Sequence, residues 1–271
     1  MGVETKEGLS VPGSHEVTRQ IVCPNCQGED TFTTWDCIDA TTEPHLRERV
    51  LHDEMMFFYF CPKCYARIRI DTPCLYIDRG RKLLVWLVPD TKMEMLESEL
   101  EDFFGSGSYS DYRCRVVRSW GEWREKIMQM ESKYDDRLYE FVKYGAYRFL
   151  NEEDKKAFYW SGYHVEYAGD DEKADELALI FMRDDEEHTT YSYPISAGMM
   201  ELTQDIFKPL LDRLPETSQT GEFRQFGYGW GGQVIEQMVA SANEGSDENL
   251  KKLVNLWFRT IGKEIFQADI P

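Results

Sequence analysis

The residues of this sequence best suited to chemistry form two copies of a C-P-x-C motif, Cys23-Pro24-Asn25-Cys26 and Cys61-Pro62-Lys63-Cys64. A C-x-x-C loop turns both sulfur atoms toward one point, where backbone N–H groups can stabilise the thiolates, and proline stiffens the loop by fixing φ. Two such loops facing each other make a tetrahedral set of four sulfur ligands. The sequence therefore predicts one metal site with Zn²⁺ as its metal and iron as the competing metal, and with four ligands: Cys23, Cys26, Cys61 and Cys64.

The two motifs are separated by residues 27–60, a longer spacing than the roughly 15–20 residues of a compact zinc ribbon. We expect a helix over residues 43–52, inserted between strands at 31–36 and 56–60, to account for the excess. Four cysteines close the coordination shell and leave no position for water or substrate, which favours a structural site over a catalytic one. A dithiol redox site is the alternative for a single C-P-x-C motif, but the βαβ pattern of a thioredoxin-like fold is missing here.

The amino-acid composition limits the classes of protein to which this chain can belong. The chain has 271 residues, is 42% hydrophobic and 14% aromatic, and so can bury the core of one large domain or two ordinary ones. Its net charge of -19, from 50 acidic and 31 basic residues, repels phosphate backbones and membrane surfaces. We therefore expect a protein partner rather than nucleic acid. Its longest apolar runs fall far short of the roughly 20 residues that span a bilayer, and we expect a cytoplasmic protein without membrane association.

Three of the seven cysteines lie outside the two motifs, namely Cys37, Cys74 and Cys114. A disulfide framework would need pairs in a small secreted chain, and neither condition holds. We expect each of the three to be a small buried hydrophobic residue.

Hydrophobic periodicity, turn residues and caps predict an α+β fold: a zinc-ribbon-like antiparallel β module with an inserted helix, followed by an α/β block with an antiparallel meander and C-terminal helices. Beyond the strands already named, we expect strands at 67–70, 83–88, 113–117, 163–167, 177–182 and 190–193. We expect helices at 91–104, at 135–149 and after a capping box of Ser119 and Glu122, and C-terminal helices at 197–213, 233–243 and 248–266. The predicted division is a flexible tail (1–20), the metal-binding module (21–110), an α+β continuation (111–215), and a glycine-rich loop with C-terminal helices (216–271).

Three further stretches carry a family resemblance together with the C-P-x-C motifs. They are PCLYIDRGRKLLVWLVP (73–89), RVVRSWGEWREKI (115–127) and DDRLYEFVKY (135–144). With them the chain resembles the CpXC family of bacterial proteins over about residues 21–215. The resemblance implies a zinc-ribbon-like β module with an α/β continuation, and it implies fold and metal rather than an activity, since the family's biochemical function is not established.

Our leading hypothesis is a non-enzymatic binding or assembly protein with a structural metal site. An enzyme is the second hypothesis, with a site in the C-terminal block near His164 and Glu166, which lie two residues apart on one face of a predicted strand. Residues 227–232 satisfy G-x-G-x-x-G formally, but they lack the strand–helix–strand context of a dinucleotide site. We interpret this glycine-rich stretch as a linker or docking loop.

Nucleic-acid binding through a basic strip at residues 61–82 is the third hypothesis. The strip has six basic residues against Asp71 and Asp78, and Trp86 or Tyr76 would stack on bases. Two weaker metal candidates are His45 with His52, which share one face of the predicted helix, and the acidic links near Asp170 and Asp184, which we interpret as exposed turns.

Overall fold

The computed structural model describes residues 13–89, 109, 111–157, 164–167, 176–183, 189–214, 223–245 and 248–267. The chain forms two compact units. The first comprises residues 1–120 with 217–223, and the second comprises residues 121–216 with 224–271.

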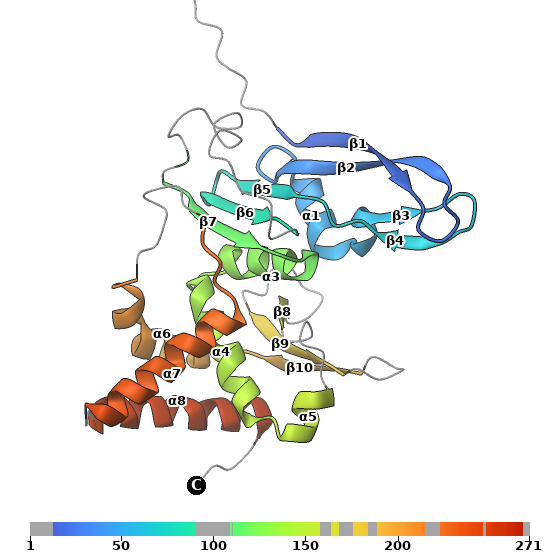
Figure 1. Cartoon of the computed structure of the whole chain (residues 1–271). Helices are drawn as coiled ribbons and strands as arrows, with labels where there is room; N and C mark the ends of the chain where they lie inside the picture. Colours follow the sequence, from blue (N-terminus) through green and yellow to red (C-terminus); the bar gives the residue numbers. More distant parts are fainter. Residues whose placement is uncertain are drawn as a thin grey trace, which may run out of the picture. The chain divides into compact units, whose positions relative to one another are not determined.

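The first unit contains a five-stranded mixed sheet and a separate two-stranded sheet (Figure 1). The larger sheet has the order β1-β2-β5-β6-β7, with bounds β1 His15–Val22, β2 Glu29–Asp39, β5 Cys74–Asp78, β6 Leu83–Leu87 and β7 Arg113–Val117. The smaller sheet pairs β3 (Phe58–Phe60) with β4 (Arg67–Arg69) in antiparallel register.

A crossover connection explains the long spacing between the two cysteine motifs. Strands β2 and β5 are parallel neighbours, and parallel strands need a connection of a dozen or more residues. This connection carries the helix α1 (Pro44–His52), the 3-10 turn η1 (Glu54–Phe57), β3 and β4. Proline at the first turn starts α1, and Leu46, Val50 and Leu51 anchor its buried face. The inserted helix predicted at 43–52 is confirmed.

The α+β class is confirmed, but the sheet of the first unit is mixed where we expected antiparallel strands only. The pairs β1–β2 and β5–β6 are antiparallel, whereas β2–β5 and β6–β7 are parallel. Whether two strands pair in parallel or antiparallel depends on the connection between them. The alternation of side chains within each strand is the same in both cases, so it does not predict the direction.

The predicted flexible tail extends too far, because β1 begins at His15 and pairs with β2 along its whole length. Most of β1 is solvent-exposed on both faces. A strand without a buried face shows no alternation of polar and apolar residues, so the usual signal of a strand was missing here.

The second unit combines helices with a three-stranded antiparallel meander of order β10-β9-β8 (Figure 1). The strands are β8 His164–Tyr167, β9 Leu177–Met182 and β10 Thr190–Pro194. The helices are α3 Trp120–Glu131, α4 Asp136–Phe149, α5 Glu152–Ala157, α6 Ala197–Leu211, α7 Tyr228–Glu244 and α8 Glu248–Phe266. The meander and the C-terminal helices are confirmed, while the helix predicted at 91–104 lies outside the described residues. No helix in the described part of the chain has the length and apolarity needed to cross a membrane.

The glycine-rich stretch is helical, so the predicted loop at 227–232 is wrong. Gly227 caps α7, and the next five residues form its first turns. A Cβ atom on Gly231 would lie 2.8 Å from the carbonyl oxygen of Glu140, and one on Gly232 would lie 2.6 Å from the Tyr144 ring. The indole of Trp230 stacks on Phe141 with ring centroids 5.3 Å apart. The glycines therefore let α7 lie close to α4, and this packing outweighs their low helix propensity.

This packing predicts opposite effects for two Gly→Ala substitutions on one helix. Gly231→Ala should destabilise the protein by about 1–3 kcal/mol, because backbone cannot move aside as a flexible side chain can. Gly229→Ala is the matched control: its Cβ would meet nothing within 4 Å, so stability should rise by up to about 1 kcal/mol from helix propensity. Urea unfolding curves measure both, and equal effects would contradict the close approach of the helices.

Candidate metal centre

The two C-P-x-C loops have the same backbone conformation. In each, the N–H of the first cysteine donates to a carbonyl five residues on: Cys23 to Gly28 at 2.9 Å, and Cys61 to Ala66 at 3.0 Å. The residue after the second cysteine donates back to the first cysteine's carbonyl, Gln27 at 2.8 Å and Tyr65 at 2.9 Å. These two residues have left-handed φ values of 57° and 60°. The loops are thus two copies of one turn.

The four sulfur atoms converge to a distance that suits a metal ion. All lie within 4.8 Å of one another, and the pairs Cys23–Cys64 and Cys26–Cys61 each have Sγ atoms 3.6 Å apart. A tetrahedral ion with metal–sulfur bonds of about 2.3 Å would set its sulfur ligands about 3.8 Å apart. All four side chains predicted as ligands are therefore brought together. Within the described residues this is the one group of three or more potential ligands close enough to share an ion.

Hydrogen bonds prepare two of the thiols to ionise. The side-chain amide of Asn25 donates to the sulfur of Cys64 at 3.3 Å and, with the N–H of Ala66, lowers the pKa of that thiol. Burial opposes ionisation of Cys61, but the N–H groups of Cys64 and Lys63, with other hydrogen bonds, lower its pKa to about 6. The N–H of Gly28 favours the thiolate of Cys26, yet burial and the three neighbouring thiols raise its pKa to about 12. A bound cation would displace the protons that remain on these sulfurs.

A small core surrounds the sulfurs. Cys23, Cys61 and Tyr59 are buried, and partly buried side chains pack around them, among them Phe32 and Ile68. The hydroxyl of Tyr59 donates to Asp30 at 2.8 Å, and burial together with this contact raises the tyrosine pKa. This core is small, and an ion bound by the four sulfurs would add a cross-link to it.

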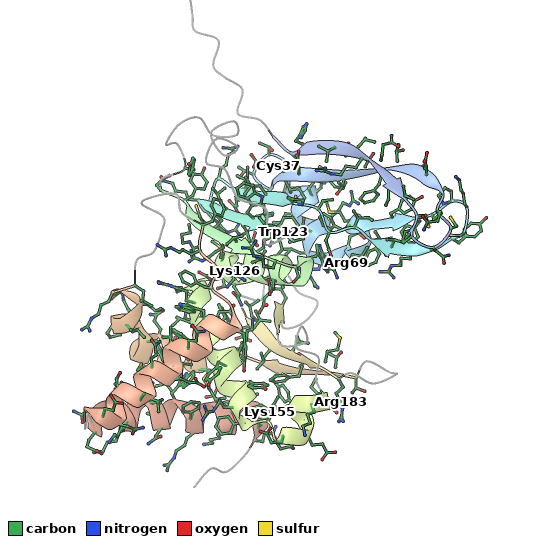
Figure 2. All side chains as sticks on the ribbon, viewed as in Figure 1. Cys37, Arg69, Trp123, Lys126, Lys155 and Arg183 are labelled. Carbon is green, nitrogen blue, oxygen red and sulfur yellow. The ribbon has the colours of Figure 1, made fainter. Side chains whose placement is uncertain are left out.

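The remaining cysteines play no part in this cluster. Cys37, Cys74 and Cys114 are fully buried, as predicted, and Figure 2 labels Cys37 in the larger sheet of the first unit. Burial raises the pKa of Cys37 and of Cys114 to about 12, and that of Cys74 well above its usual range. Such thiols are unreactive.

The structure brings few of the weaker candidates together. His52 lies 3.8 Å from Glu48, and no cluster of ligands forms around His45 or His52 in the described residues. Residues His164 and Glu166 do lie on one strand, β8, opposite Ile180 and Ala178, and their side chains are outside the described part of the structure. The acidic links at Asp170 and Asp184 also lie outside it.

Much of the basic strip at 61–82 is engaged in ion pairs. Arg79 bonds to buried Asp39 and Arg81 bonds to Asp78, each at 2.7 Å, while Lys82 pairs with Asp111. Tyr76 is fully buried, so the prediction that it stacks on bases is wrong. Trp86 packs edge-on against Phe223 with ring centroids 5.4 Å apart.

A buried network of charges joins α3 to α4, and the sequence analysis missed it. The ammonium of Lys126 donates to Gln129 at 2.6 Å and Glu140 at 3.0 Å, and lies 3.3 Å from Asp136. Lys143 contacts Glu125 at 2.7 Å and Glu140 at 3.0 Å. All of these residues are at most 5% exposed, and Figure 2 labels Lys126 on α3. In the sequence these charged residues are indistinguishable from a solvent-exposed helix face, because charged residues are seldom buried unless they are paired. Only the structure shows the pairing.

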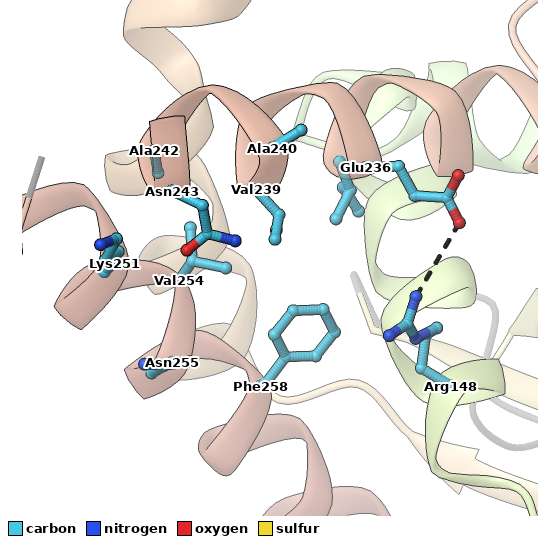
Figure 3. A pocket seen from close by; sticks show the side chains of 11 residues that line it. Arg148, Glu236, Val239, Ala240, Ala242, Asn243, Lys251, Val254, Asn255 and Phe258 are labelled. Atoms are coloured by element: carbon cyan, nitrogen blue, oxygen red, sulfur yellow. Dashed lines mark ion pairs between the residues drawn. The ribbon is translucent and has the colours of Figure 1, made fainter. Parts of the chain in front are cut away.

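A cleft of about 610 Å³ lies among α4, α7 and α8 (Figure 3). Its walls include Val239, Val254 and Phe258, and an ion pair between Arg148 and Glu236, 3.8 Å apart, lies at its edge. No histidine or cysteine is among its lining residues. Glu236 and Lys251 are its titratable lining residues besides Arg148, and neither residue named in the enzyme hypothesis, His164 or Glu166, is among them.

Comparison with known proteins assigns the part of the chain that contains the cysteine cluster. The family model described as CpXC protein matches residues 21–143, which contain all four clustered cysteines and the buried charge network. This segment belongs to the CpXC family. No curated protein and no solved structure matches the chain.

The buried network predicts a large loss of stability when one partner is removed. Lys143→Met should cost about 3–5 kcal/mol, because it leaves buried carboxylates without their cation. Lys155→Met is the control: Lys155 pairs with Glu152, which is 82% exposed, and should cost about 0–1 kcal/mol. Similar losses in urea unfolding for both variants would show that the network is unimportant.

The same network predicts acid sensitivity. Burial raises the pKa of Glu140, but Lys126 and Lys143 outweigh it and hold that pKa below its usual value. A carboxyl whose pKa is lowered by folding contributes stability above its unfolded pKa of about 4.3, and this stability is lost as pH falls toward the folded pKa. The Glu140→Gln variant should therefore show a weaker decline in stability between about pH 5 and pH 3 than the native protein. A decline of unchanged size would contradict this assignment.

Proposed function

We propose that this chain binds one zinc ion through Cys23, Cys26, Cys61 and Cys64, and that the ion is structural. The observation that carries the proposal is the convergence of four sulfur atoms from two matching loops to within 4.8 Å. An all-cysteine shell suits zinc, with iron as the competing metal. Because four thiolates close the shell, the site supports folding rather than catalysis.

We infer that zinc would stabilise the module strongly. Apparent binding free energies of structural zinc sites are about 10–16 kcal/mol at neutral pH, and binding to the folded state alone adds to folding free energy. Here the ion would connect the β1–β2 hairpin with the β3–β4 sheet, whose shared core is small. Seven free cysteines fit a reducing compartment, and we propose the cytoplasm.

We propose that the protein is a binding or assembly module rather than an enzyme. Support comes from the cluster of four cysteines, which would close the shell of a bound ion and leave no position for substrate. The chain's net charge favours a protein partner over a nucleic-acid duplex. An enzyme with a site near His164 and Glu166 remains the alternative prediction. Loss of an activity in His164→Ala or Glu166→Ala, with metal content unchanged, would support it.

The metal assignment predicts one zinc per chain in untagged protein, measured by mass spectrometry of metals. Cys61→Ser should lose the metal and unfold at a lower temperature, because three thiolates bind zinc less tightly than four. Cys114→Ser is the matched control: its sulfur is equally buried but lies outside the cluster, so zinc should be retained. The proposal is contradicted if the purified protein contains no metal and Cys23 and Cys26 cycle between dithiol and disulfide. That result would indicate a redox protein.

A further inference from the structure

The outer face of the β3–β4 sheet consists of aromatic and basic side chains. In this register Phe58 lies opposite Arg69, and Phe60 lies opposite Arg67. Because side chains alternate along a strand, these four residues share one face, and Tyr59 and Ile68 turn the other way into the core around the cysteines. The guanidinium of Arg67 lies 3.9 Å from the centroid of the Phe58 ring, which confirms the shared face.

Two rings of this region are open to solvent. Phe60 is 50% exposed and Tyr65 is 86% exposed, and both are among the few large hydrophobic residues with such exposure in the described chain. They adjoin the second cysteine loop on either side, since Phe60 precedes Cys61 and the N–H of Tyr65 donates to the Cys61 carbonyl. Tyr65 also has a left-handed φ of 60°, which is rare for a bulky residue. Folding gains little from such a ring, which points to a role in binding.

Basic side chains lie next to these rings in the sequence, although acidic residues outnumber basic ones in the chain as a whole. Lys63 in the loop and Arg67 on β4 are exposed, and Arg69 is exposed while paired with Asp71 at 3.0 Å. Charges more than about 8 Å away are largely screened at physiological ionic strength, so the distant acidic surface opposes binding here only weakly. Exposed rings interleaved with cations are the chemistry by which proteins hold unpaired bases and their phosphates.

We propose that the outer β3–β4 face, with Phe60, Tyr65, Lys63 and Arg67, binds single-stranded nucleic acid by stacking bases on the two exposed rings. The inference rests on the proposed function, because the metal would hold the second cysteine loop and hence Tyr65 in place. It keeps only the first part of the basic strip at 61–82, around the second cysteine loop and β4, since Arg79 and Arg81 are committed to ion pairs and Tyr76 is buried. A duplex has no unstacked bases to offer and binds weakly.

The test measures fluorescence anisotropy of a labelled twelve-nucleotide oligothymidine with the full metal-loaded chain. We expect saturable binding, weaker binding to a duplex of the same length, and a slope of log affinity against log salt of about -1.4, as the two cations Lys63 and Arg67 would give on a single strand. Tyr65→Asn should weaken binding at least fivefold, since losing one stacking ring costs about 1–3 kcal/mol. Asparagine tolerates left-handed φ, so the loop should keep its shape.

Matched variants separate stacking from charge and from folding. Tyr65→Phe keeps the ring and should bind as the native protein does, and Met55→Ser removes a 38% exposed apolar residue outside this face and should change nothing. Metal content is measured for every variant, so that failure of the metal proposal is recognised separately. Any one of three results overturns the inference. The first is no binding to the single strand, and the second is binding unaffected by Tyr65→Asn at full metal content. The third is equal competition by polyglutamate, which would indicate a site for acidic peptides.

Discussion

The first unit depends on the meeting of four sulfur atoms at one point. Each cysteine loop connects two adjacent strands, the first joining β1 to β2 and the second joining β3 to β4. Few apolar side chains lie between these two pairs of strands, so hydrophobic burial alone holds them together weakly. A metal ion shared by both loops would supply a further cross-link, and the matching hydrogen bonding of the loops directs the four sulfurs toward one point.

The chain reaches this arrangement through one crossover. Between the parallel strands β2 and β5 it forms α1, η1, β3 and β4, so the second loop is carried on a connection rather than on the main sheet. The N–H of Ile70 donates to Phe57 at 2.9 Å where the small sheet ends. The binding surface that we infer, on the outer side of β3 and β4, thus exists only while the second loop keeps its shape. A structural metal site and a binding surface need not be separate properties of this module.

The sequence predicted the cysteine cluster better than it predicted the strand pairing. Cysteine ligands are set by local spacing, and the helices and strands with regular apolar periodicity, such as 177–182 and 248–266, lie where that periodicity placed them. By contrast, β1 has no buried face, so its sequence lacks the alternation of polar and apolar residues that predicts a strand. The glycines at the start of α7 have low helix propensity, and they are helical because α7 packs closely against α4. The buried charges of α3 and α4 were missed for a related reason. From sequence alone, a lysine or glutamate is predicted to be exposed to solvent. Its burial requires an oppositely charged partner that only the fold supplies, as Glu125 does for Lys143.

The most direct test of this account is X-ray absorption spectroscopy at the zinc edge of the purified native chain. The account predicts four sulfur scatterers at about 2.3 Å and no nitrogen or oxygen ligand in the first shell. A shell with fewer sulfurs and with light-atom ligands would mean that at least one of the four cysteines does not bind the metal. In that case the two loops would be held together by something other than a closed tetrathiolate centre.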